Sequence, residues 1–500
     1  MNPPLMNLDF AAVAPVAIVG IGAMAVLVLE VFLAKSRSLS EFHVSSALAL
    51  VATVALGMAI GTAAQAFFQG WSTVFNPDNP MLRLDRFSSF ATLLVGIGAL
   101  LSVWLSIQYL IELKINHGEY YALLLISTAG MMLMVSAVDL ITVFLGLEIL
   151  SIPLYVLAGF DRRKLNSNES AMKYFLIGSF ASGLLLYGMA LLYGTTGHTD
   201  LEGIRAAFST DNPLSVAGLG LIVVGLAFKV SAVPFHQWTP DVYEGAPTSI
   251  TAFMSVTVKA AAFVTLLRFV GGSAVPENLT QVFWVLAALT IIVGSVTAVV
   301  QDNVKRMLAY SSIGHAGIIL LGFVAGSHEA HSAVLFYLFA YLFMNLGAFG
   351  VMVALADRGR DWDHIEDFAG LARKRPGMAA LMTLFMLSLA GIPGTVGFIA
   401  KFQIFATTVQ AGYIPLTVIA VLGSVISVYY YLRLPVWMYM REPGDVVPRS
   451  GIDTTEGIVL VACAFAVVLF GLFPNGGFPV WLLQDASALS WAREAAAALR

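Results

Sequence analysis

Fourteen long apolar runs constrain what this 500-residue chain can fold into. Most are close to the roughly 20 residues that an α-helix needs to cross the hydrocarbon core of a bilayer. Only 11% of the residues are charged, against about 25% in a soluble protein. The sequence therefore predicts an all-α, polytopic membrane protein with about 14 transmembrane helices, near 11–33, 43–68, 87–111, 120–137, 139–159, 171–194, 213–233, 248–271, 279–300, 308–325, 330–356, 377–408, 413–440 and 452–473.

Two of these runs are expected to be broken helices. The run at 377–408 is too long for one straight helix and contains AGIPGTVG at 390–397. The seventh run is followed by Pro234 and a compact polar segment, His236 to Glu244. A helix interrupted at membrane depth exposes backbone polar groups, which is tolerated only against protein or a water-filled cavity.

The two breaks suggest an internal repeat. Each is the fourth member of a block of five helices, helices 4–8 and helices 9–13, and such a pattern is typical of inverted repeats in transporters. No soluble domain fits between the helices, and the tail holds a short interfacial helix at best. The predicted organisation is three N-terminal helices (1–119), a first repeat (120–271), a second repeat (279–440), and a final helix with its tail (452–500).

The distribution of basic residues predicts the orientation. Arg162 to Lys164 follow the fifth helix and Lys305 and Arg306 follow the ninth, whereas the loops after even-numbered helices are poorer in basic residues. Because cytoplasmic loops carry the excess of lysine and arginine, the odd loops are expected in the cytoplasm and both termini on the opposite side. The N-terminus lacks the basic region of a cleaved signal peptide, so the first run should remain as a spanning helix.

One acid and three lysines fall near the middle of four predicted helices: Glu148, Lys229, Lys259 and Lys401. Placing a charged side chain at the bilayer centre costs from about 2.5 to more than 10 kcal/mol of free energy. We therefore expect an acidic partner that offsets the cost and a function that requires the charged group. Lysine can lose its proton when it is buried, whereas arginine stays charged. A line of groups that can change protonation across the membrane centre is what proton transfer requires.

Each of these groups also has a simpler interpretation. Glu148 could be a protonated carboxyl bonded to a backbone carbonyl, or it could pair with Lys229 and act as a proton switch controlled by distance. Lys259 could extend toward the membrane surface, although this works best near helix ends. Lys401 could merely cap the broken half-helix beside it.

The histidines and the remaining basic residues of the predicted helices give weaker evidence for a functional site. His315, inside the tenth helix, is either a satisfied core residue or a proton relay between lysines, and the sequence favours neither. His236 is expected in a loop. Arg268 and Lys173 lie close to helix ends and are expected to be structural.

Several site classes are excluded. No histidines or carboxylates have metal-ligand spacing, and there is no phosphate loop, GxGxxG or nucleophile elbow. The single cysteine, Cys463, excludes an internal disulfide, a cysteine-ligated iron–sulfur cluster and a CxxC redox site. The net charge of −4 gives no reason to expect nucleic acid. The chain itself is therefore expected to hold no cofactor and no metal.

Four long motifs resemble a known family: LGLEILSIPLYVLAGF, LAFKVSAVPFHQWTPDVYEGAPT, QDNVKRMLAYSSIGHAG and LAGIPGTVGFIAKF. They are similar to the antiporter-like membrane subunits of respiratory complex I, above all to subunit N of NADH–quinone oxidoreductase. The resemblance covers nearly the whole chain. It implies fourteen helices with two inverted five-helix repeats and a proton path through Glu148, Lys229, Lys259 and Lys401.

The resemblance also implies a setting. The chain would pump protons in a bacterial inner membrane beside other membrane subunits and lipid, while NADH, FMN, iron–sulfur clusters and quinone act in other subunits. The middle antiporter-like subunit has glutamate where this chain has Lys401, and the distal one has a long lateral helix that is lacking here. Two alternatives stay open: a cation/proton antiporter subunit of a multisubunit sodium–proton exchanger, and a structural spacer between pumping subunits.

Overall fold

Helices make up nearly all the regular structure of the computed structural model, which describes residues 9–34, 41–77, 79–271, 277–357, 359–443, 451–476 and 487–499. One short antiparallel pair joins β1 (Thr73–Val74) to β2 (Arg83–Leu84). The helices are η1 (Phe10–Ala12), α1 (Ala14–Ala34), α2 (Glu41–Gln69), α3 (Arg86–Glu112), α4 (Glu119–Ser136), α5 (Leu140–Ala158), α6 (Leu165–Thr196), α7 (Leu201–Ala207), α8 (Pro213–Val230), α9 (Trp238–Gly245), α10 (Thr248–Val270), α11 (Glu277–Ala298), α12 (Val304–Ala325), α13 (His328–Leu355), η2 (Ile365–Phe368), α14 (Leu371–Lys374), α15 (Pro376–Ala390), α16 (Val396–Gln410), α17 (Ile414–Met440), α18 (Thr454–Leu472) and α19 (Ala488–Ala497).

The predicted spans are confirmed, including both breaks. Within the described residues, thirteen helices are long and apolar enough to cross a membrane. The run predicted at 377–408 is instead two half-helices of 15 residues each, α15 and α16. The seventh span ends at Val230 and resumes as the short helix α9. With α15 and α16 taken together as one crossing, the described residues contain the fourteen spans predicted.

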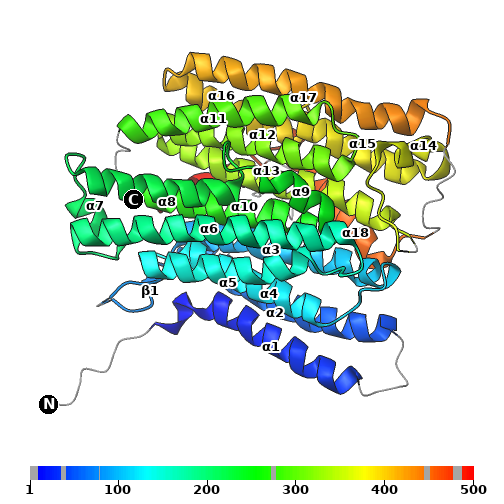
Figure 1. The fold of residues 1–500 in the computed structure, drawn as a ribbon, viewed down its shortest axis with the longest axis horizontal. Helices are drawn as coiled ribbons and strands as arrows, with labels where there is room; N and C mark the ends of the chain where they lie inside the picture. The colour runs from blue at the N-terminus through cyan, green and yellow to red at the C-terminus, as the bar shows by residue number, and fades with distance from the viewer. Residues whose placement is uncertain are drawn as a thin grey trace.

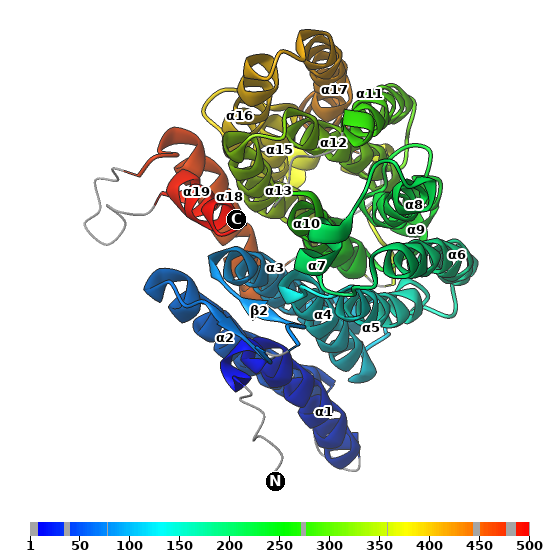
Figure 2. The same cartoon turned by 90° about the vertical axis from the view of Figure 1, so that its left-hand side faces the viewer.

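The helices lie side by side along one common direction (Figure 1), so they are seen nearly end-on in Figure 2. The N-terminal helices α1 and α2 form one edge of the bundle, and α16 and α17 form the opposite edge. Helix α10 is buried along its whole apolar length, and α12 and α13 are buried along almost all of theirs, whereas little of α1 is buried. The centre of the bundle is therefore built from α10, α12 and α13.

Contacts between loops confirm the alternation of the spans. The end that carries the loops after odd-numbered spans, which we call the basic face, is joined by bonds among those loops and the adjoining helix ends. The opposite end is joined in the same way by the loops after even-numbered spans and the helix ends beside them. The basic-face bonds include Lys164 to Asp361 (3.0 Å), Arg163 to Leu113 O (2.6 Å) and Arg433 to Gln301 O (3.0 Å), and the opposite face has Arg83 to Glu202 (2.8 Å) and Arg205 to Arg268 O.

The tail forms the short helix that was expected, but this helix packs on protein. One side of α19, including Leu489 and Ala492, is buried against α3 and α13. Residues 1–8 and 477–486, which belong to the first and last predicted segments, lie outside the described residues. The division into two inverted repeats, 120–271 and 279–440, remains a prediction.

Candidate functional site

The first helix break is closed by protein hydrogen bonds. Helix α8 ends where Ser231 takes a left-handed conformation (φ 65°), and its N–H donates to Phe228 O at 3.0 Å. The indole of Trp238, at the start of α9, donates to the same oxygen at 3.1 Å. The hydroxyl of Thr239 donates to Ser231 at 2.7 Å. The backbone groups that a broken helix exposes are thus paired inside the bundle, as membrane depth requires.

Lys229 lies one residue before the end of α8 and is 2% exposed. Its ammonium nitrogen has no hydrogen-bond partner among the described residues. It lies instead 5.2 Å from the ring centre of Tyr174, 5.5 Å from that of Tyr155 and 5.7 Å from that of Phe228. Aromatic faces attract a cation, and most strongly where water is excluded. The structure therefore gives Lys229 an aromatic cage rather than a carboxylate contact.

Glu148 lies on α5, half-buried, and its Oε1 atom is buried without a hydrogen-bond partner in the described part of the chain. The carboxyl is within electrostatic range of both Lys229 and Tyr155. The two side chains form no ion pair within 4 Å, so the close Glu148–Lys229 pair expected from the sequence is not made in this structure. Their interaction acts at longer range, beside the tyrosine rings.

Sequence reasoning missed Tyr155 and Tyr174. A signal for Tyr155 was available, because it follows Glu148 by seven residues, two helical turns, and so lies on the same side of α5. The structure shows why the ring sits where it does: at Gly178 on α6, a Cβ atom would overlap the Tyr155 hydroxyl. The small residue on α6 lets this tyrosine pack tightly against the helix.

Lys259 is at the middle of α10, eleven residues from each end, and is 2% exposed. Its ammonium donates a 2.6 Å hydrogen bond to the main-chain oxygen of Ser312 on α12. The contact is made in the interior of the bundle. Lys259 therefore does not extend toward a membrane surface, which was the simpler interpretation of this residue.

His315 is bonded through both ring nitrogens. Nδ1 lies 2.6 Å from the hydroxyl of Tyr337 on α13, and Nε2 lies 2.9 Å from that of Tyr431 on α17. The charges of both Lys259 and Lys401 act on the ring. His315 thus has the satisfied environment of a core residue and also the neighbours that a relay needs. The two tyrosines were missed, because α13 and α17 each carry more than one tyrosine and the sequence does not show which of them faces His315.

The second break holds a lysine as well. Helix α15 ends at Ala390, and Gly391 follows in a left-handed conformation (φ 86°). Lys401, on α16 and 5% exposed, donates a 2.9 Å hydrogen bond to Ala390 O. This is the contact expected of a cap, and the negative end of the α15 dipole favours an ammonium there. A Cβ atom at Gly391 would lie only 2.9 Å from Lys401 Cδ.

The other bases are placed as expected. Arg268 makes a bidentate, buried ion pair with Asp85, both bonds 2.9 Å long. Lys173 lies 2.6 Å from both Glu169 and Asp241. These contacts are structural. His236 lies in the turn between α8 and α9, as predicted, and is half-buried there.

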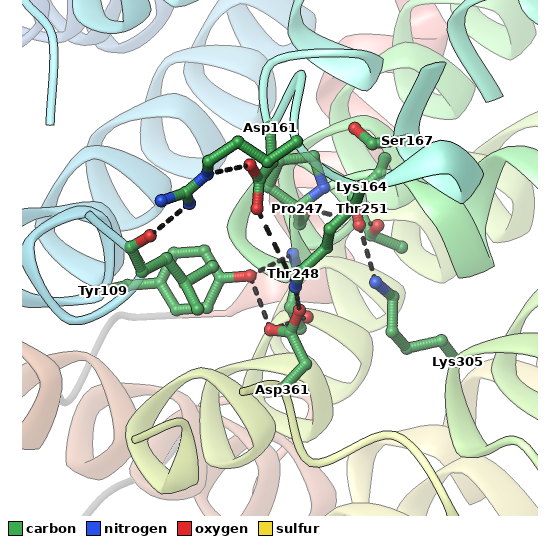
Figure 3. A network of polar contacts seen from close by, with 12 residues as sticks. Tyr109, Asp161, Lys164, Ser167, Pro247, Thr248, Thr251, Lys305 and Asp361 are labelled. Carbon is green, nitrogen blue, oxygen red and sulfur yellow. Dashed lines mark hydrogen bonds and ion pairs between the residues drawn. The ribbon is translucent and has the colours of Figure 1, made fainter. Parts of the chain in front are cut away.

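A polar network joins the basic face to the bundle (Figure 3). The Asp361 carboxylate accepts bonds from the Tyr109 hydroxyl (2.7 Å), the Thr248 hydroxyl (3.0 Å) and the Lys164 ammonium (3.0 Å). Tyr109 also accepts the N–H of Thr248 at 2.7 Å, which fixes the start of α10. Burial raises the pKa of Asp361, but the charges of Lys305 and Lys164, together with the hydrogen bonds from Tyr109 and Lys164, hold that pKa below its ordinary value.

These groups can take up, hold and release protons. In the part of the chain that the structure describes, no three histidine, cysteine or acidic side chains come close enough to hold a metal ion. The site is a series of buried ionisable groups on α5, α8, α10, α12 and α16, with a helix break at Lys229 and another at Lys401.

Comparison with known proteins agrees with this architecture. The family described as NADH:quinone oxidoreductase/Mrp antiporter, TM matches residues 137–427. NADH-quinone oxidoreductase subunit N of Trichlorobacter lovleyi is 44% identical, over 94% of this chain and 95% of that protein. The same subunit of Myxococcus xanthus is 41% identical, over 97% and 99%.

Solved structures show the same fold. A chain of respiratory complex I from Thermus thermophilus with bound aureothin is 34% identical, with a TM-score of 0.79, over 93% of this chain and 99% of that one. A chain of the Mrp complex from Dietzia sp. has a TM-score of 0.84 at 20% identity, over 98% and 97%, which is a likeness of fold alone. This multi-pass membrane protein belongs to the NADH:quinone oxidoreductase/Mrp antiporter family, and within it to subunit N of NADH-quinone oxidoreductase.

Proposed function

We propose that the chain is the proton-translocating subunit N of a bacterial NADH–quinone oxidoreductase. The observation that carries the proposal is that three lysines are buried inside the bundle. Lys229, Lys259 and Lys401 are each at most 5% exposed, and the last two act electrostatically on His315. Burying three such groups is costly, and the cost is understandable if protons must move between them.

In this proposal, a change of charge beside Glu148 alters its pull on Lys229. When that pull weakens, the aromatic cage alone cannot hold the charge against burial, and Lys229 releases its proton toward Lys259. The proton continues through His315 to Lys401. Carbonyl oxygens can only accept hydrogen bonds, so Ser312 O and Ala390 O stabilise the protonated forms of Lys259 and Lys401.

The redox chemistry belongs to other subunits. We propose that NADH, FMN, iron–sulfur clusters and quinone bind there, and that this chain contacts other membrane subunits of the complex. A multisubunit setting is supported by the related chain in complex I from Thermus thermophilus. The basic face would be cytoplasmic and both termini would lie on the opposite side of the inner membrane.

The test is Lys229→Ala in the assembled complex in vesicles, with quinone-linked proton pumping as the readout. We expect pumping to be lost. Lys173→Ala is the matched control, because this lysine lies on the neighbouring helix α6 in a partly exposed ion pair. Unchanged pumping in Lys229→Ala would overturn the assignment.

A cation/proton antiporter subunit is the second candidate, favoured by the shared fold of the Mrp chain. The same lysines would serve it, so their substitution does not separate the two functions. Measurements on the purified native complex do separate the two functions. Flavin and iron–sulfur absorbance favours the oxidoreductase, and sodium-dependent proton exchange without that absorbance favours the exchanger.

A further inference from the structure

A groove runs over α4, between α1 and α5, at the edge of the bundle near the basic face. Figure 2 shows these three helices together at the periphery. The groove has a volume of about 540 Å³, within the range of roughly 300–1,000 Å³ that is typical of ligand sites. Its apolar wall includes Leu27, Leu123, Ile126 and Val156. Leu27 is 39% exposed and Val156 is 46% exposed, so this wall faces outward, where hydrocarbon would lie.

The end of the groove at the basic face is polar. Lys114, Arg162, Arg163 and His117 line it, together with the acids Glu119 and Asp161. Asp161 is bound by Arg163 at 2.9 Å. The side chains of Lys114 and Arg162 form no ion pair within the described residues. Set against Glu119, they leave this end of the groove with an excess of one positive charge for a ligand.

The backbone at Lys114 is unusual. This residue has a left-handed conformation (φ 57°), which residues other than glycine seldom adopt, and its N–H donates to Ile111 O at 3.0 Å. Together with the bond from the Ile115 N–H to Leu110 O (2.9 Å), this bond closes the end of α3 as a Schellman motif, which places a left-handed residue at this position. At this position it turns the chain directly after α3, at the mouth of the groove.

We propose that this groove binds an anionic phospholipid. The phosphate would lie against Lys114 and Arg162, and one acyl chain would follow α4 past Leu123 and Ile126. Positive charge at one end and an apolar channel along the helices match the two parts of a phospholipid, and basic pockets at helix ends are known to bind anionic headgroups. A helix of another protein would match the groove only if it carried an acidic side chain at the level of Lys114 and Arg162.

Photolabelling in the assembled complex tests the proposal. The probe is phosphatidylglycerol with a diazirine in its acyl chain, and labelled peptides are identified by mass spectrometry. We expect label on α4 and α5, near Ile126 and Val156. Lys114→Gln with Arg162→Gln should lower it by about 5-fold for each charge removed. Arg373→Gln, an exposed base on the same face outside the groove, is the matched control and should leave the labelling unchanged.

A second variant changes the apolar part of the groove instead of its charges. Leu123→Trp fills the apolar part without touching the charges, and it should also reduce labelling. Three outcomes would overturn the proposal: equal labelling by a phosphatidylcholine probe, unchanged labelling in either variant of the groove, or a photocrosslink from a probe built into α4 to another subunit. The last result would assign the groove to a protein partner.

Discussion

The ammonium of Lys259, at the middle of α10, lies 2.6 Å from the main-chain oxygen of Ser312 on α12. His315 follows Ser312 by three residues, so it lies on the same side of α12 about one turn further along. The imidazole reaches tyrosines of α13 and α17. Helix α12 therefore connects a lysine of the first predicted repeat with hydroxyl groups of the second, which is where a proton passing between the repeats would have to cross.

This arrangement predicts that His315→Gln blocks the crossing. Glutamine keeps hydrogen-bonding capacity for both tyrosines but cannot take up a proton at neutral pH. We expect pumping to fall by about 100-fold, the lower range of general acid–base effects, while uncoupled electron transfer persists. Tyr337→Phe is the comparison variant: it removes one hydroxyl group and one hydrogen bond worth about 1 kcal/mol. Because it leaves the imidazole in place, it should lower pumping less than His315→Gln does. Wild-type pumping in His315→Gln would identify the histidine as a core residue only.

The aromatic cage of Lys229 predicts a second result, from a residue that does not touch the lysine. Gly178→Ala places a methyl group against the Tyr155 hydroxyl and must displace that ring. We expect a loss of about 1–3 kcal/mol in the free energy of unfolding, together with lower pumping. Gly183→Ala on the same helix meets nothing within 4 Å and should be neutral or slightly stabilising. Thermal unfolding and vesicle pumping of both variants decide the matter, and equal behaviour of the two would exclude a role for the cage.

The second break can be tested with two neighbouring glycines. Gly391 (φ 86°) and Gly394 (φ 89°) share the left-handed conformation, so alanine at either costs roughly 1–2 kcal/mol. Only Gly391→Ala also brings a methyl group against Lys401, because a Cβ atom at Gly394 would meet no described atom within 4 Å. We expect similar thermal destabilisation in both variants but lower pumping in Gly391→Ala. Similar pumping would show that the position of Lys401 is not critical.

The sequence was enough to predict the spans and both breaks, because length, hydropathy and glycine–proline patterns act locally. It also placed Lys259 at mid-depth, since a buried charge stands out in an apolar run. It could not predict which way each side chain faces. Lys229 meets the rings of Tyr155 and Tyr174 rather than the Glu148 carboxylate because of the way α5, α6 and α8 pack on one another. That packing depends on close contacts between helices, such as Gly178 against Tyr155.

Contacts far apart in the sequence were beyond prediction for the same reason. Asp361 lies in the loop between α13 and α15, yet its carboxylate is bonded to Tyr109 and Lys164. We predict that Asp361→Asn lowers the free energy of unfolding by about 1–3 kcal/mol, less than for a fully buried pair because Lys164 is partly exposed. Glu202→Gln, in the exposed pair with Arg83, should cost at most about 1 kcal/mol.

The dependence on pH separates the charge of Asp361 from its shape. Because the pKa of Asp361 is held below its ordinary value of about 3.9, the stability it adds is fully present above that value and is lost as the pH falls through the lower, folded-state pKa. Thermal unfolding should therefore show a constant gap between the wild type and Asp361→Asn from pH 7 to pH 5, and a shrinking gap below about pH 4. A gap that stays constant to pH 3 would mean that the carboxylate charge is not what stabilises the contacts of Asp361 with Tyr109, Thr248 and Lys164.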